Sequence, residues 1–227
     1  ETGLAFDVAI HIGTFIALIC YFYKDIYNLV LGVLGKNDQK RLAWLLVFAT
    51  LPAVVGGYLL QDLAESSFRS PALVAINMIW VAVAMIVAES YSSRRKNKTT
   101  LSNTSTKQGM AIGFAQVVAL VPGVSRSGST ITVGIFSGLD RVSATRFSFL
   151  LAIPITFGAI LKVLTSSEGV SQISSETGVF LVGILAAFAS GIFAIRFLLK
   201  FLAGHSLNIF AYYRIALGAV VLLLLAI

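Results

Sequence analysis

The chain has 227 residues, of which 57% are hydrophobic and only 12% charged, and its mean hydropathy is +0.90. This charged fraction is about half of that in soluble globular domains, which excludes a protein with an ordinary solvated surface. The net charge is +7. The basic residues stand in short segments beside apolar runs, as they do in membrane loops, so no nucleic-acid partner is expected. The composition therefore predicts an all-α integral membrane protein.

Six apolar runs are long enough to cross a bilayer, which takes about 20 residues. They cover residues 4–23, 42–60, 71–89, 144–164, 178–200 and 208–227. Lysine and arginine concentrate in segments 24–41 and 90–109, which we expect on the cytoplasmic side, whereas segments 61–70 and 165–177 are expected outside. The alternation of the two kinds of loop supports six transmembrane helices.

Between the third and fourth runs, two shorter apolar stretches, 110–121 and 131–139, flank Pro122 and Gly123. Stretches of this length are too short to span a bilayer. Irregular backbone at membrane depth is tolerated where it is buried in protein or lines a water-filled cavity. The pattern predicts a re-entrant helical hairpin that enters and leaves from the cytoplasmic side. The Ser/Thr/Asn-rich stretch 99–106, just before it, is expected to be a flexible connector.

A weak internal repeat relates residues 6–13 to residues 147–154, and each segment begins a set of three apolar runs. Three crossings per unit make the second unit inverted relative to the first, an architecture that commonly places a site near the bilayer midplane. We predict one membrane domain, 1–227, that consists of unit one at 4–90, a connector at 91–109 and unit two at 110–227. Unit one lacks a hairpin of its own, so a first re-entrant hairpin of roughly 40 residues is expected to be missing from this chain.

The most distinctive polar segment is 122–130, with the sequence PGVSRSGST. An arginine at membrane depth costs ~2.5 kcal/mol or more, so Arg126 is expected to have a partner or a function. Its planar guanidinium matches two oxygens of a phosphate group. Ser125 or Ser127 can cap a helix that begins here, and the N–H groups at such a helix start bind anions. The segment therefore predicts a phosphate site.

Other residues complete the predicted site. Gly123 and Gly128 leave room for close approach of a ligand, and Thr130 adds a hydroxyl group. His11, in the first run, is a further candidate, although a histidine bonded to a neighbouring helix is the alternative. Arg214 is expected to extend its charged end to the membrane interface. Serine and glycine are also common in helix packing, but packing does not explain Arg126.

The nine-residue segment resembles the second signature of the bacterial undecaprenyl-diphosphate phosphatases, the bacitracin-resistance family. Residues 113–116 and 146–154 around it, and residues 6–14 and 213–214 near the ends, resemble the family too, so the resemblance covers essentially the whole chain. It implies a multi-pass enzyme of the bacterial cytoplasmic membrane, with its active site open to the outer face. The implied reaction removes one phosphate from a C55 polyprenyl diphosphate and recycles the carrier lipid for cell-wall (peptidoglycan) synthesis.

By this resemblance the expected catalytic residues are Arg126 and Ser125. The expected phosphate-binding residues are Gly123, Ser127, Gly128, Thr130 and His11. The family's other signature supplies paired glutamates for a divalent cation, Mg²⁺ or Ca²⁺, together with the nucleophile. That signature is not found in this chain, so no metal ligands are expected among the 227 residues and the fragment alone is expected to be inactive.

The expected partners are the lipid substrate and the bilayer, and a homo-oligomer is left open. Two other functions also stay open at this point. An inverted repeat with broken helices would serve a transporter or flippase of a phosphorylated lipid equally well. The third interpretation is a non-catalytic membrane partner.

Overall fold

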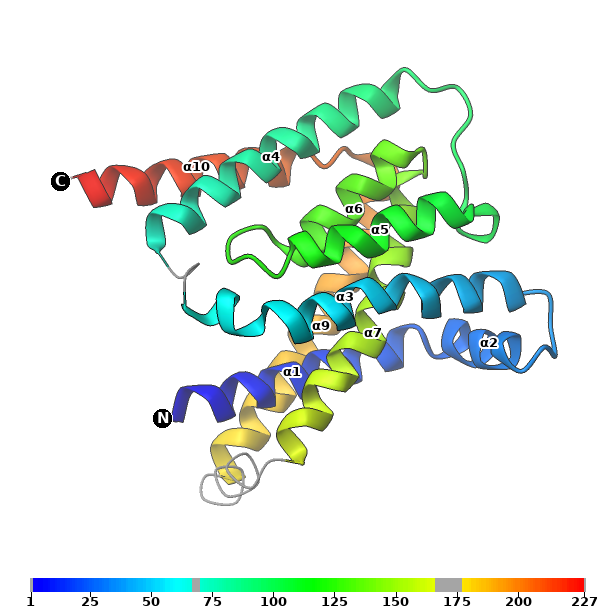
Figure 1. The fold of residues 1–227 in the computed structure, drawn as a ribbon, viewed down its shortest axis with the longest axis horizontal. Helices are drawn as coiled ribbons and strands as arrows, with labels where there is room; N and C mark the ends of the chain where they lie inside the picture. The colour runs from blue at the N-terminus through cyan, green and yellow to red at the C-terminus, as the bar shows by residue number, and fades with distance from the viewer. Residues whose placement is uncertain (1, 67–69, 166–176, 227) are drawn as a thin grey trace.

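The computed structural model describes residues 2–66, 70–165 and 177–226, and within these ranges it contains helices and no sheet (Figure 1). Five helices are long and apolar enough to cross a membrane, and a sixth span results if one bent pair of helices is counted together. These helices confirm the prediction of an all-α integral membrane protein. The predicted external loop 165–177 lies almost entirely outside the described residues.

The helices follow one another with short connections. In chain order they are α1 (Thr2–Tyr21), α2 (Tyr23–Val33), α3 (Lys40–Ser66), α4 (Pro71–Ser93), the 3₁₀ helix η1 (Leu101–Asn103), α5 (Thr106–Val118), α6 (Arg126–Ser137), α7 (Arg141–Leu164), α9 (Thr177–Gly204) and α10 (Asn208–Ala226). All six predicted runs match a helix within a few residues, because about 20 apolar residues are what a single crossing requires; these helices are α1, α3, α4, α7, α9 and α10.

The loop predicted after the first run needs a correction. The chain bends by 79° between residues 10–21 of α1 and α2, so part of the segment predicted as a charged loop is helical. The reason lies in apolar residues at helical spacing, Ile26, Leu29, Val30 and Val33, which give α2 one apolar face. That face packs toward α3, where the same residues line a groove together with Ala43, Leu46 and Val47.

The predicted hairpin consists of α5 and α6, which pack against each other between α3 and α4 (Figure 1). Its two ends lie together, because the Thr99 N–H donates to the Gly138 carbonyl at 2.9 Å and the Asp140 N–H donates to the Thr99 carbonyl at 3.0 Å. A chain that leaves where it entered has the shape of a re-entrant hairpin, as predicted. The side of the membrane from which it enters stays a prediction.

The segment before the hairpin is ordered, which corrects the prediction of a flexible connector. It contains η1, and the Leu101 N–H donates to the Ser143 hydroxyl at 2.9 Å. Ser105 then begins α5 with a capping box, in which the Gln108 N–H donates to Ser105 Oγ and the Ser105 N–H donates to Gln108 Oε1. The serine and threonine hydroxyls that suggested flexibility therefore serve as hydrogen-bond partners and caps.

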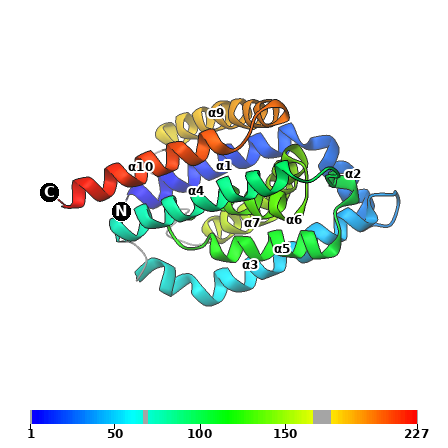
Figure 2. The ribbon, with the colours of Figure 1, turned by 90° about the horizontal axis from the view of Figure 1, so that it is seen from above.

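Helices from the two halves of the chain pack in pairs, α1 against α9 and α4 against α10 (Figures 1 and 2). Small residues allow the first contact to be close, because Gly13 packs on the backbone of α9 and Gly191 lies against Ala17. The internal repeat, with units at 4–90 and 110–227, stays a prediction.

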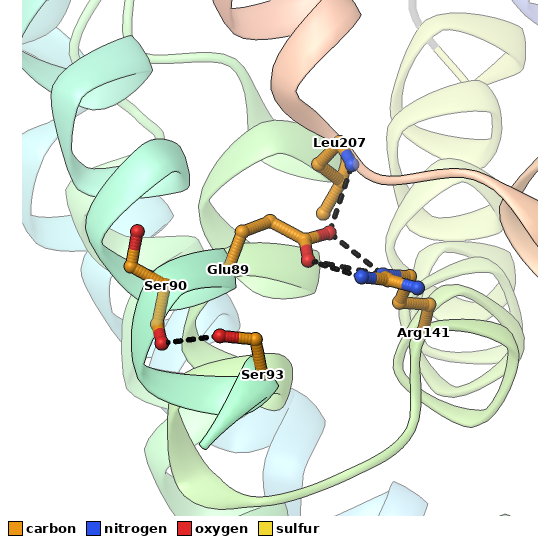
Figure 3. A network of polar contacts seen from close by, with 5 residues as sticks. All are labelled: Glu89, Ser90, Ser93, Arg141 and Leu207. Carbon is orange, nitrogen blue, oxygen red and sulfur yellow. Dashed lines mark hydrogen bonds and ion pairs between the residues drawn. The ribbon is translucent and has the colours of Figure 1, made fainter. Parts of the chain in front are cut away.

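A buried ion pair joins three further elements (Figure 3). Glu89, near the end of α4, is only 3% exposed and accepts hydrogen bonds from Arg141 Nε at 2.9 and 3.0 Å and from Arg141 Nη2 at 2.7 Å. The Leu207 N–H donates to the same carboxylate at 2.8 Å. The sequence assigned no role to Glu89; the structure places it at the junction of α4, the start of α7 and the turn before α10.

Candidate phosphate site

The start of α6 is built by an unusual serine. Ser125 has a φ of +70°, a region that favours glycine, and is the only non-glycine residue with positive φ among the described residues. From this conformation its Oγ accepts the Gly128 N–H at 3.1 Å and its carbonyl accepts the Ser129 N–H at 2.9 Å. Of the two predicted caps, Ser125 is therefore the one that caps the helix. The N–H groups of Arg126 and Ser127 have no intrahelical partner at this position.

Two side chains hold the turn between α5 and α6 through its carbonyls. Asn77 of α4 donates to the Pro122 carbonyl at 2.8 Å. Arg214 of α10 donates to the Gly123 carbonyl at 2.7 Å and to the Val124 carbonyl at 3.2 Å. This corrects the expectation that Arg214 extends to the membrane interface, because unpaired carbonyls at this depth attract a cation more strongly than a distant interface does.

The two glycines of the motif are surrounded by protein. Gly123 has a φ of +87°, and a Cβ atom there would overlap the backbone of Val74. A Cβ atom at Gly128 would lie 3.0 Å from Ser125 Oγ. In the structure, therefore, these glycines make room for α4 and for the cap, and their effect on a ligand is through the shape of the turn.

A cavity of about 430 Å³ lies in front of Arg126. Among the predicted residues, Arg126, Ser127 and His11 line this cavity, and Gly123, Ser125, Gly128 and Thr130 do not. The lining comes from four helices: His11, Thr14 and Leu18 of α1; Arg126 and Ser127 of α6; Ser148, Phe149, Ala152 and Thr156 of α7; and Gly191, Ala194, Ile195 and Leu198 of α9. The wall therefore combines a few polar groups with a majority of apolar residues, as in many ligand sites.

The Arg126 guanidinium makes no hydrogen bond or ion pair with the residues that the structure describes, although its backbone carbonyl accepts the Thr130 hydroxyl at 2.8 Å. The charged arginines of the neighbouring helix are different. Arg141 pairs with Glu89, and Arg146 donates to Asp25 at 2.6 Å. Arg126 therefore lines the cavity with guanidinium donors that no described protein group satisfies.

Thr130 lies beneath the cavity. It is 1% exposed, and its hydroxyl forms a 2.6 Å hydrogen bond with the hydroxyl of Ser148, which does line the cavity. Thr130 thus orients a hydroxyl that faces the cavity. Sequence reasoning missed Ser148, Thr14 and Thr156, because hydroxyl residues inside apolar helices usually serve packing; their only signal is helical spacing, Ser148 and Thr156 lying on the same face of α7.

No three His, Cys, Asp or Glu side chains among those described lie close enough together to hold a metal ion. Among the described residues that line the cavity, Arg126 is the one charged side chain, and no carboxylate is present. The described part of the chain therefore offers an anion site, with hydroxyl and guanidinium donors, and does not fit a divalent cation by itself.

Known proteins are similar to this chain over most of its length. Residues 1–220 match the protein family described as "Bacitracin resistance protein BacA". Three similar relatives, each named undecaprenyl-diphosphatase, come from Rubrobacter xylanophilus (42% identical over 237 residues, 98% of this chain and 84% of the relative), Thermodesulfovibrio yellowstonii (40% over 222 residues, 98% and 82%) and Moorella thermoacetica (38% over 223 residues, 97% and 83%).

Proposed function

The chain belongs to the bacitracin resistance protein BacA family, and we propose on this premise that it hydrolyses undecaprenyl diphosphate to undecaprenyl phosphate and inorganic phosphate. Water adds to the terminal phosphorus, the phosphoanhydride P–O bond breaks, and the lipid monophosphate leaves. The enzyme is a multi-pass membrane hydrolase. The names of the relatives favour hydrolysis over the transport of a phosphorylated lipid.

One observation carries the proposal at the level of residues: the unpaired Arg126 guanidinium faces a cavity inside a membrane protein. A charge at membrane depth is costly without a partner, so the site is arranged for an anion that arrives with the substrate. A guanidinium can hold two phosphate oxygens at once, and the free N–H groups at the start of α6 add donors aimed at the same anion. These groups offset the negative charge that moves to the bridging oxygen as the P–O bond breaks.

The rest of the lining suits an isoprenoid. Leu18, Phe149, Ile195 and Leu198 provide apolar contacts beside the polar groups around Arg126. A substrate with a charged head and a hydrocarbon chain matches a cavity with one polar end and apolar walls. The hydroxyls of Ser127 and Ser148 lie at the polar end, where they can hydrogen-bond to phosphate oxygens.

The proposal includes a divalent cation, Mg²⁺ or Ca²⁺, which would supply further charge neutralisation during phosphoryl transfer. The described residues do not form its site. The proposal further places the protein in the bacterial cytoplasmic membrane, with the cavity open to the outer face.

The test uses the intact gene product, purified in detergent and supplied with undecaprenyl diphosphate. We expect saturable release of inorganic phosphate that a chelator abolishes and that added Mg²⁺ or Ca²⁺ restores. Transfer of labelled lipid across the membrane of liposomes without phosphate release would contradict the proposal and would favour the transporter instead.

A further inference from the structure

A second polar cavity lies on the other side of α7. It has a volume of about 540 Å³ and lies between α2, the start of α3, η1 and the start of α7. Its charged lining consists of Asp25, Asp38, Arg41 and Arg146. None of its lining residues lines the Arg126 cavity, so the two cavities are separate and share only the helix between them.

Both arginines of this cavity keep hydrogen-bond donors free. Arg146 donates to Asp25 through Nη2 at 2.6 Å, while its Nε is buried without a hydrogen-bond partner in the described structure. Arg41 donates through Nη2 to the Thr104 carbonyl at 3.2 Å and forms no ion pair with a described carboxylate. The donors that the two guanidinium groups leave free at this cavity indicate an acceptor that is supplied from outside the chain.

The charged side chains of this cavity that form no ion pair have opposite signs. Asp25 neutralises Arg146, whereas Arg41 and Asp38 lie in the same cavity without an ion pair to each other or to another described residue. One unpaired cation and one unpaired anion are complementary to a zwitterion. A phosphate beside Arg41 and Arg146, with an ammonium group beside Asp38, would satisfy all of them.

An apolar groove continues from this cavity. Leu29 and Leu150 line both, and the groove extends between α2, α3 and α7 past Val47, Leu51 and Ile153 with a further volume of about 320 Å³. Thr50 brings the groove's one hydroxyl, and that hydroxyl is already bonded to the Leu46 carbonyl at 2.7 Å. The groove therefore offers only apolar contacts.

The polar cavity and the apolar groove succeed each other along the membrane-spanning helices. The polar cavity lies at the first residues of α3 and α7, both of which are long enough to cross the bilayer, and the groove lies further along the same helices. A membrane lipid has the same order, with its head group at the ends of the helices and its chains along them.

We propose that this cavity and groove bind a phospholipid with a phosphate–ammonium head group, of the phosphatidylethanolamine class, with one chain in the α2–α3–α7 groove. The phosphate binds to the guanidinium groups of Arg41 and Arg146 that line the cavity, and the ammonium group binds to Asp38. The inference is independent of the proposed hydrolysis, because it concerns other residues and its test measures binding.

The test is native mass spectrometry of the purified protein during titration with dioleoyl phosphatidylethanolamine. The double variant Arg41→Gln/Arg146→Gln should weaken binding about tenfold, as the loss of charged hydrogen bonds does. Val47→Trp, which fills the groove, should weaken it by a similar factor. Arg94→Gln, which removes an exposed arginine outside both volumes, is the matched control and should change nothing.

Two further variants test the role of each carboxylate separately and distinguish a specific effect on binding from a general loss of folding. Asp25→Asn releases Arg146 and should strengthen binding. Asp38→Asn should weaken phosphatidylethanolamine and leave phosphatidylglycerol, which has no ammonium group, unchanged. Free phosphoethanolamine and dioleoylglycerol should each bind at least tenfold more weakly than the whole lipid. Equal binding by the double variant and the Arg94→Gln control, or no effect of Val47→Trp, would overturn the proposal.

Discussion

Arg126 and Arg141 each stand at the first residue of a helix, yet their surroundings are opposite. The start of α7 is neutralised twice, because Asp140 caps it with a carboxylate at 2.8 Å from the Ser143 N–H and Glu89 pairs with Arg141. The start of α6 has a neutral cap, Ser125, and no described carboxylate bound to its arginine. A helix N-terminus carries about half a positive charge, so only the start of α6 remains open to an anion.

The difference separates a structural arginine from a functional one. Arg141 has its counter-ion within the fold, and its pairing does not depend on any ligand. Arg126 has donors of the same kind aimed into a cavity of about 430 Å³. We therefore expect substitutions of Arg126 to lower activity without changing stability, and substitutions of Arg141 to lower stability first.

The largest effect is expected at Arg126. Arg126→Ala should lower kcat/KM for phosphate release on the order of 10³-fold, because the transition state loses a charged bidentate partner. The melting temperature should stay unchanged, since no described protein group loses a bond. Arg94→Ala, at an exposed arginine, is the matched control for both measurements. Retained turnover in Arg126→Ala would remove the phosphate role from this residue.

The second effect is on stability. Glu89→Gln should lower the free energy of unfolding by about 3 kcal/mol, because it leaves Arg141 and the Leu207 N–H without their shared carboxylate. Thermal unfolding in detergent measures the change. Ser93→Ala is a nearby control, since the exposed Ser93 hydroxyl donates only to the Ser90 carbonyl (Figure 3). Adding Arg141→Gln to Glu89→Gln should recover part of the loss; a strictly additive second loss would argue against a coupled pair.

A smaller effect on activity is expected at Arg214. It binds the carbonyls of Gly123 and Val124 and does not line the Arg126 cavity, so it acts by positioning the turn before Arg126. Arg214→Gln should lower kcat/KM about tenfold, since small displacements of a catalytic group have effects of this order. If Arg214→Gln equalled Arg126→Ala in effect, the comparison between the two roles would need revision.

The smallest effect concerns Ser125. Ser125→Ala removes the cap and should cost about 1 kcal/mol of stability, whereas Ser125→Gly should cost only a few tenths because glycine accepts the φ of +70°. Thermal unfolding and phosphate release are measured on both variants. If Ser125 only shapes the turn, Ser125→Gly keeps most of the activity; equal inactivation by both substitutions would instead support the catalytic role predicted from the sequence.

The sequence predicted the long helices, the hairpin and Arg126, because each depends on local composition: about 20 apolar residues for a crossing, shorter stretches for the hairpin, and a charge at membrane depth. It missed α2. The apolar face of this helix, at Ile26, Leu29 and Val33, lies in a segment that was interpreted as a loop because charged residues flank it. The helical spacing of the apolar residues alone would have predicted this helix.

The remaining misses are contacts between distant segments. Arg214 binds main-chain carbonyls, which every residue has, so no residue type in the sequence identifies its partners. Glu89 and Arg141 are 52 positions apart, and several other pairs of opposite charge could have formed instead. Thr130 was predicted from its place in the motif, but only the fold places it beneath Ser148 and away from the cavity.

Helix α7 is the partition between the two cavities, with Ser148 and Ala152 on one side and Arg146 and Leu150 on the other. Because both cavities use this one helix as a wall, a bulky substitution on either face of α7 narrows a cavity directly, and any displacement of the helix axis changes the shape of both.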